Sequence, residues 1–185
     1  MTDSSTGGIL TNSTPALNDE ALDLVFQNFF SSLTGINIAY VLRRWTAEPR
    51  TPPDFGSTWI AVGVADIKDD DYPAQTFIDG VGLVVERHEM LEVMASFYGP
   101  MAQQAMRAAS DSVLIYQNNE QIFATYGIIF HHYDDPVKSP QLMQNRWNNR
   151  IDRTFTFRRQ IVSTYDVLSL ETLNDTLTDG ILSVS

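Results

Sequence analysis

The most constraining feature of this sequence is a long alternating pattern at residues 147–162. Six of its positions share one parity, four of them apolar and two basic: Ile151, Arg153, Phe155, Phe157, Arg159 and Ile161. The five positions between them are polar. Because successive side chains of a β-strand point to opposite faces, the pattern predicts one long strand with an apolar face tipped by arginines.

Shorter patterns predict three helices. The first is expected to follow an Asn18 N-cap and to end at Gly35, since its first turn is acidic and its later residues form a broad apolar face. The second is expected at about 100–116. The third is expected at 119–126 and closed by Gly127.

Strand patterns fall in five further ranges: 58–66, 77–86, 88–98, 128–133 and 166–170. The second and third could equally form one bent pair with a bulge near Gly80 and Gly82. Since helices and strands do not alternate one by one, the order favours an α+β fold. We expect a mainly antiparallel sheet flanked by two or three helices on one face.

The length of 185 residues fits one domain with its own core. Residues 1–17 are rich in Ser, Thr, Gly and Asn and predict a mobile N-terminal arm, and 173–185 predict a loose C-terminal tail. The single domain is therefore expected at 18–172. The chain does not begin with a basic and apolar leader, so we expect it in the cytoplasm where it is made.

Composition and motifs exclude several kinds of chemistry. The absence of cysteine excludes disulfides, thiolate zinc sites and a cysteine nucleophile, and the net charge of −11 opposes binding to nucleic acid or anionic membranes. Neither a nucleophile-elbow serine nor a phosphate-binding glycine loop is present. His131 and His132 are neighbours on a predicted strand, so they should point to opposite faces and not share a metal ion. We expect no enzymatic activity, no cofactor and no metal.

Charge is unevenly distributed along the chain. Residues 138–160 contain six basic residues and one acid, whereas residues 1–42 contain four acids and no Lys or Arg. One interpretation is a sheet face solvated by arginine; another is a basic surface on one copy that meets an acidic surface on the next. The second interpretation makes four arginines candidates for subunit or ring contacts: Arg150, Arg153, Arg158 and Arg159.

Three stretches carry a more specific signal. They are Arg44-Trp45-x-x-Glu48-Pro49 with Pro52-Pro53-Asp54-Phe55-Gly56-x-x-Trp59, then Ser96-Phe97-Tyr98-Gly99-Pro100, then Asn145-Arg146-Trp147-x-x-Arg150-x-Asp152 with Arg158-Arg159. Together they resemble the neck or tail-terminator-like proteins of tailed bacteriophages. The resemblance covers roughly residues 19–172.

The resemblance implies a non-enzymatic virion protein with a tail-terminator-like fold. It implies a homo-oligomeric ring, a hexamer, between a head-completion or connector protein on one side and a tail tube or tail protein on the other. DNA would pass through the lumen without specific binding, and no membrane would be involved. From the residues alone a second function stays open, that of a small-ligand or peptide-binding α+β module of a bacterial cytoplasm.

Two short motifs have a physical interpretation beside the resemblance. Tyr98-Gly99-Pro100 predicts a rigid, fold-forming corner from strand to helix, since glycine allows an unusual backbone and proline starts a helix. The loop at 49–56 is stiffened by proline and would lose little entropy on docking. Three of its residues are candidates for contact with a neighbouring ring: Pro52, Pro53 and Phe55.

A ring through which DNA slides should have an acidic or neutral lumen, because a wall of Lys and Arg would hold phosphates. Two sets of surface carboxylates are candidates for this lining: Asp69 to Asp71, and Glu86, Glu89 and Glu92. The arginines are then expected to face protein.

Overall fold

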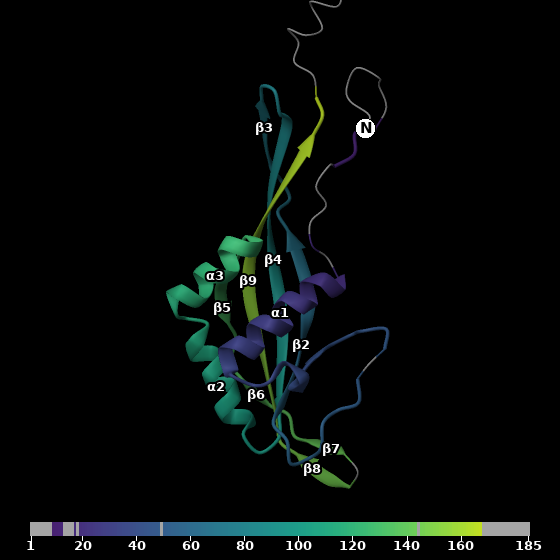
Figure 1. The fold of residues 1–185 in the computed structure, drawn as a ribbon, viewed down its shortest axis with the longest axis vertical. Coiled ribbons are helices and arrows are strands. Elements are labelled where there is room, and N and C mark those ends of the chain that lie inside the picture. The colour runs from purple at the N-terminus through teal and green to yellow at the C-terminus, as the bar shows by residue number, and fades with distance from the viewer. Residues whose placement is uncertain (1–8, 13–16, 18, 49, 144, 168–185) are drawn as a thin grey trace, which may run out of the picture. The chain divides into compact units, whose positions relative to one another are not determined.

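The computed structural model of the chain describes residues 9–12, 17, 19–48, 50–143 and 145–167 (Figure 1). The chain forms two compact units, a larger one of Leu17–Asp69 and Glu89–Gln160 and a smaller one that includes Asp70–His88. The predicted arm and tail lie largely or wholly outside the described residues. The domain boundaries drawn from them therefore stay predictions.

Within its described residues, the larger unit contains three α-helices and one short 3-10 helix. They are α1 (Asp19–Thr34), η1 (Ile38–Tyr40), α2 (Ala102–Ser112) and α3 (Tyr116–Tyr126). α1 and α3 end as predicted at Gly35 and Gly127, whose φ angles of 70° and 66° are left-handed. α2 ends earlier than predicted, because the side-chain amide of Asn119 donates to the carbonyl of Val113 (2.5 Å).

The sheet of the larger unit is mainly antiparallel, as predicted. Its strands are β1 (Val41–Arg43), β2 (Trp59–Asp69), β4 (Gly82–Tyr98), β5 (Ile128–Tyr133), β6 (Val137–Lys138) and β9 (Arg150–Tyr165). Their order is β1-β2-β4-β9-β5, with β6 beside β9; β1 and β2 are parallel, whereas the pairs β2–β4, β5–β9 and β6–β9 are antiparallel. A separate two-stranded sheet consists of β7 (Gln141–Met143) and β8 (Arg146–Asn148). The α+β class is thus confirmed.

The three helices pack on one face of this sheet, where they share a single apolar core (Figure 1). Phe26 and Phe30 of α1 lie against Phe157 and Phe155 of β9, with ring centroids 4.9 and 5.0 Å apart. All four rings are fully buried. The parity predicted for the long strand is therefore confirmed, and its apolar side is the one that the helices cover.

In the smaller unit, β3 (Ala74–Ile78) pairs antiparallel with the first residues of β4. The amide of Val81 donates to the carbonyl of Ile78 (3.0 Å), and Gly80 has a φ of 73°. The strand predicted at 77–86 is therefore wrong. The chain turns at residues 79–81 because glycine allows the left-handed backbone of a hairpin turn, and β4 then runs unbroken from Gly82.

The structure describes only the first two residues of the predicted final strand at 166–170. β9 extends to Tyr165, beyond the predicted end at residue 162, and residues 166 and 167 are not in a strand. Residues 168–170 lie outside the described part of the chain.

Tyr98-Gly99-Pro100 lies between β4 and α2. Gly99 has a φ of 93°, and its amide donates to the carbonyl of Asn149 (3.0 Å). A Cβ atom at this position would overlap the carbonyl oxygen of Ser57. Both the backbone conformation and the close approach therefore require glycine here.

Replacing Gly99 by alanine should lower the free energy of unfolding by about 2–4 kcal/mol, since the new side chain adds left-handed strain and a backbone clash. Urea unfolding followed by circular dichroism measures the loss. Gly56→Ala is the matched control, because a Cβ at Gly56 meets no atom within 4 Å, and it should change stability by less than about 0.5 kcal/mol. Equal effects of the two substitutions would contradict this account of the corner.

Candidate functional site

The face of the sheet opposite the helices carries a small aromatic cluster. Trp59 of β2 and Tyr98 of β4 stack with ring centroids 3.9 Å apart and planes 4° from parallel. Leu42 of β1 completes this second buried cluster. The three side chains connect β1, β2 and β4 on the side of the sheet opposite the described helices.

A group of three charged side chains and one serine, here termed the open-face cluster, lies on the same side: Arg44, Ser96, Arg150 and Asp152. Arg44 donates to the Ser96 hydroxyl, which donates to the Asp152 carboxylate. Nε of Arg150 donates to the same carboxylate (2.8 Å), and its guanidinium lies 5.5 Å from the centre of the Tyr98 ring. The cluster therefore links β1, β4 and β9 by charge-assisted hydrogen bonds.

Burial and pairing act differently on the two arginines of the open-face cluster. Burial lowers the pKa of Arg44. Burial also opposes the charge on Arg150, but the hydrogen bond to Asp152 and nearby negative charge outweigh it and raise the pKa of Arg150. Both guanidinium groups remain charged at neutral pH. Sequence reasoning missed Arg44 and Ser96, although a serine within the apolar run of β4 was a signal.

Arg153 and Arg158 of the sequence-derived set lie on opposite sides of β9. Arg153 donates from Nε to the carbonyl of Asp134 (2.7 Å) and from Nη1 to the Ser110 hydroxyl (2.6 Å), and it stacks 3.8 Å from the centre of the Tyr133 ring. It therefore ties α2 to the end of β5. Arg158 is exposed and directed away from the helices, opposite Ile129 of β5.

The expectation that Arg159 presents a charge at the surface is wrong. Its side chain is 3% exposed and forms an ion pair with Glu89 of β4, to which both Nε and Nη2 donate. Nη1 donates to the carbonyl of Leu17, just before α1. The reason is the strand parity, which places Arg159 on the face that the helices cover.

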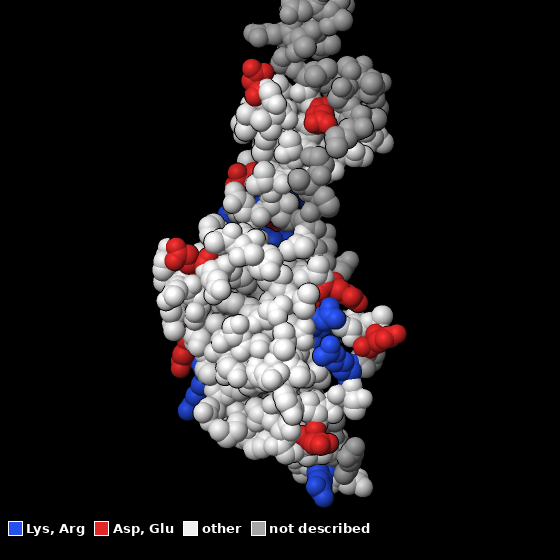
Figure 2. Space-filling model, in the orientation of Figure 1, with Lys and Arg blue, Asp and Glu red and all other residues white. Residues whose placement is uncertain are grey.

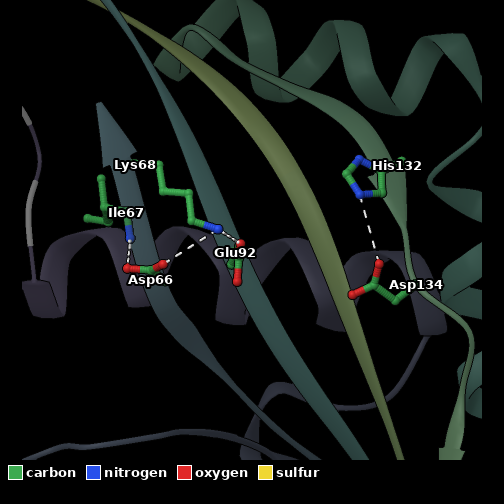
Figure 3. Close-up of polar contacts among 6 residues, drawn as sticks. All are labelled: Asp66, Ile67, Lys68, Glu92, His132 and Asp134. Carbon is green, nitrogen blue, oxygen red and sulfur yellow. Dashed lines mark hydrogen bonds and ion pairs between the residues drawn. The ribbon is translucent and has the colours of Figure 1, made fainter. Parts of the chain in front are cut away.

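The expectation that Glu86, Glu89 and Glu92 all lie at the surface is wrong for Glu89. It is buried in the pair with Arg159, whereas Glu92, on the opposite side of β4, binds Lys68 near Asp66 (Figure 3). The hydrogen bond and charge of Glu92 raise the pKa of Lys68. Glu86 belongs to the smaller unit and lies 3.7 Å from Nε2 of His88.

The two adjacent histidines do not point apart as predicted. A bulge between Phe130 and His132 breaks the alternation of β5, and Nδ1 of His131 lies 2.7 Å from Nδ1 of His132. His132 also lies 3.9 Å from Asp134 (Figure 3). Within the described residues, no group of three or more potential metal ligands is present.

The proline-rich loop is irregular in its described residues. Pro52 is exposed, whereas Pro53 and Phe55 are half-buried, and the amide of Ser57 donates to the carbonyl of Asp54 (2.9 Å). The loop thus leaves its tip accessible. It lies in the larger unit, as do all four candidate arginines.

The helical face, formed by the outward sides of α1, α2 and α3, is poor in charge. α1 has no charged residue after Asp23, α2 has Arg107 and Asp111, and α3 has Glu120. Figure 2 shows this face as a broad uncharged surface with charged side chains at its margins. An open groove of about 250 Å³ lies between α1 and α3. Sequence reasoning missed this surface, although the lack of Lys and Arg in residues 1–42, which include α1, was visible.

None of the described helices is long and apolar enough to cross a bilayer; the longest of the three, α1, has 16 residues. The described polar clusters are hydrogen bonds and ion pairs within the protein. The larger unit has two distinct surfaces, one helical and poor in charge and one formed by strands and bearing arginines.

The buried Glu89–Arg159 pair should dominate the stability of the larger unit. Glu89→Gln should lower the free energy of unfolding by about 3–5 kcal/mol, because it leaves a buried guanidinium without its counter-charge. The matched control is Glu92→Gln in the exposed pair with Lys68, for which we expect a loss below about 1 kcal/mol. Chemical denaturation of the two variants tests this, and similar losses would contradict the role of the buried pair.

Comparison with known proteins identifies a family for this chain. A search of the curated proteins finds no match, but the family model described as phage neck terminator protein matches residues 21–181. The match covers most of the chain and extends past residue 172, where the sequence resemblance had been taken to stop. The family is one of structural proteins. The chain belongs to the phage neck terminator protein family and is a structural protein of the virion neck that contacts other head and tail proteins.

Proposed function

We propose that this chain assembles as a closed ring of six identical subunits that joins the head connector to the tail and lets DNA pass through its lumen. The observation that carries the proposal is the difference between the two sides of the larger unit. The helical face is poor in charge, whereas the opposite side presents arginines. Head-to-tail contacts in a ring require two different surfaces of this kind.

The exposed apolar side chains of the helical face support its role as a contact surface. Leu114, Ile115 and Tyr116 are consecutive at the α2–α3 junction and are all more than half exposed. Contiguous exposed apolar residues mark interaction sites, and charged residues are depleted at the centre of protein interfaces. A neighbouring subunit that covers this junction would remove it from water.

The strand side supplies the second contact in this proposal. Arg158 is exposed, while Arg150 and Arg153 are held by Asp152 and by Ser110. Arg158 is therefore the arginine best placed to meet a carboxylate on a neighbour, and the other two fix the backbone around it. The exposed tip of the proline-rich loop, with Pro52, is proposed to contact the adjacent ring.

The lumen is proposed to be lined by carboxylates of the segment that contains β3. Residues 70–88 carry four carboxylates against one arginine: Asp70, Asp71, Asp79 and Glu86 against Arg87. Asp70 and Asp71 are exposed. A negative wall repels phosphates and lets DNA slide. Glu89 is excluded from this lining, because it is buried.

Purified chain should form rings whose mass is six times that of the subunit, as measured by mass photometry and electron microscopy. Arg158→Glu should reduce the ring fraction several-fold and make the remaining rings more sensitive to salt, because it replaces attraction by repulsion across the contact. Arg146→Glu, exposed on β8 in the separate two-stranded sheet, is the matched control of equal charge change and should leave most rings intact. Monomers at every concentration would contradict the ring, and rings unaffected by Arg158→Glu would contradict this contact.

The charge of the lumen can be tested separately in particles. Asp70→Lys with Asp71→Lys should leave heads joined to tails but slow DNA ejection several-fold, because lysines at the wall would bind phosphates. Ejection measured by release of a fluorescent DNA dye gives the rate. An unchanged rate in particles that carry the variant would contradict the proposed lining.

A further inference from the structure

The outward side of α3 carries one carboxylate between two aromatic rings. Tyr116, Glu120 and Phe123 are spaced at i, i+4 and i+7, so they share one side of the helix. All three side chains are exposed, Tyr116 to 77% and Phe123 to 47%. The helix contains no Lys or Arg, so no base within α3 offsets the charge of Glu120. We term these three side chains the α3 stripe.

A different side of α3 attaches the helix to its own sheet. Ile122 is the buried residue of the helix. The side-chain oxygen of Asn119 accepts a hydrogen bond from the amide of Phe130 in β5 (3.3 Å), and the side-chain amide of Asn119 donates to the carbonyl of Val113. The α3 stripe is therefore held on a fixed helix and is left exposed.

A carboxylate between aromatic rings is suited to an arginine side chain. The planar guanidinium can donate two parallel hydrogen bonds to a carboxylate and can also stack on an aromatic ring. The same combination occurs within this chain, where Arg150 donates to Asp152 and lies 5.5 Å from the centre of the Tyr98 ring. The α3 stripe thus fits an arginine that a protein partner presents beside an apolar side chain.

The carboxylate of α2 is less suited to this role. Asp111 is exposed, but Arg107 lies one turn before it on the same helix. A base at this spacing offsets the charge of an acid. Of the carboxylates on α2 and α3, Glu120 is therefore the better acceptor for an incoming cation.

The strand side of the larger unit presents a matching arginine. Arg158 is exposed and takes part in none of the ion pairs of the described residues. Its cross-strand neighbour Ile129 in β5 is also exposed and shares its side of the sheet. Together they offer a cation beside an apolar group, which complements an acid beside aromatic rings in both charge and polarity.

The two surfaces lie on opposite sides of the β5–β9 pair. α3 lies on the helical side of β5 (Figure 1), whereas Arg158 and Ile129 lie on the other side. A copy that places its Arg158 on the α3 stripe of a neighbour therefore leaves its own α3 stripe open to the next copy. Such a contact is head-to-tail, which is the kind that a ring requires.

We propose that Arg158 of one copy docks on the α3 stripe of the next copy, with its guanidinium on the Glu120 carboxylate between Tyr116 and Phe123. The inference rests on the proposed function and deepens it, because it names the carboxylate that meets Arg158. Ile129 packs beside the aromatic rings in this contact. The pair is thereby removed from water, which strengthens the attraction between its charges.

A charge exchange tests the pair in assembled rings. Glu120→Arg alone should lower the ring fraction several-fold, and Glu120→Arg combined with Arg158→Glu should restore most rings, because the pair is then reversed and not lost. Asp111→Arg combined with Arg158→Glu is the matched control of equal charge, and it should restore none. Mass photometry measures the ring fraction. If Glu120→Arg restores no more rings than Asp111→Arg does, the contact is overturned while the ring stands.

Cross-linking tests the same contact without requiring a closed ring. The chain has no cysteine, so two single-cysteine versions can be mixed. One carries Ala124→Cys, one turn after Glu120, and the other carries Gln160→Cys, two residues after Arg158; both positions are exposed. Disulfide dimers should form about tenfold faster than in a control mixture with Gln103→Cys, exposed on α2, in place of Ala124→Cys, because docking raises the effective concentration.

The two experiments separate the contact from the ring. Selective cross-linking in a protein that forms no rings would support the contact and contradict the proposed ring. Rings with equal cross-linking rates and without restoration by Glu120→Arg would overturn the contact alone. Neither rings nor selective cross-linking would contradict both. Thermal unfolding of each variant confirms that its fold is intact.

Discussion

The two-residue period of the central strands is the constraint on which the rest of the larger unit depends. In β9 it places Phe155 and Phe157 against the helices and leaves Asp152 and Arg158 on the opposite side. The same alternation in β4 separates Glu89 from Glu92. A shift of one residue in either strand would bury the polar set and expose the rings. The register thus defines both surfaces at once.

This arrangement gives the larger unit two surfaces of different character. Most of the described arginines that sequence reasoning took as contact residues are used internally: Arg159 by Glu89, Arg150 by Asp152, and Arg153 by α2. They make the sheet rigid. What remains for partners is a helical face poor in charge and an exposed strand side, which suits a neck terminator protein that contacts both head and tail proteins.

The sequence could predict those features of the fold that depend on neighbouring residues alone. The left-handed caps at Gly35 and Gly127 and the buried side of β9 follow from glycine chemistry and alternation. It could not predict the partner of Arg159, because Glu89 is distant in sequence and only strand pairing brings them together. The contact of the two histidines depends on a bulge after Phe130, which leaves no mark in the residue pattern. The helical face was missed because uncharged residues were not treated as a signal.

The central proposal is that Arg158 contacts protein and that Asp70 and Asp71 face DNA. A cryo-electron microscopy map of the virion neck, at a resolution that shows side chains, tests it most directly. The account predicts a ring of this chain in which Arg158 lies in a protein contact and Asp70 and Asp71 face the channel. A ring whose inner wall is lined mainly by the arginines of β9 would contradict it.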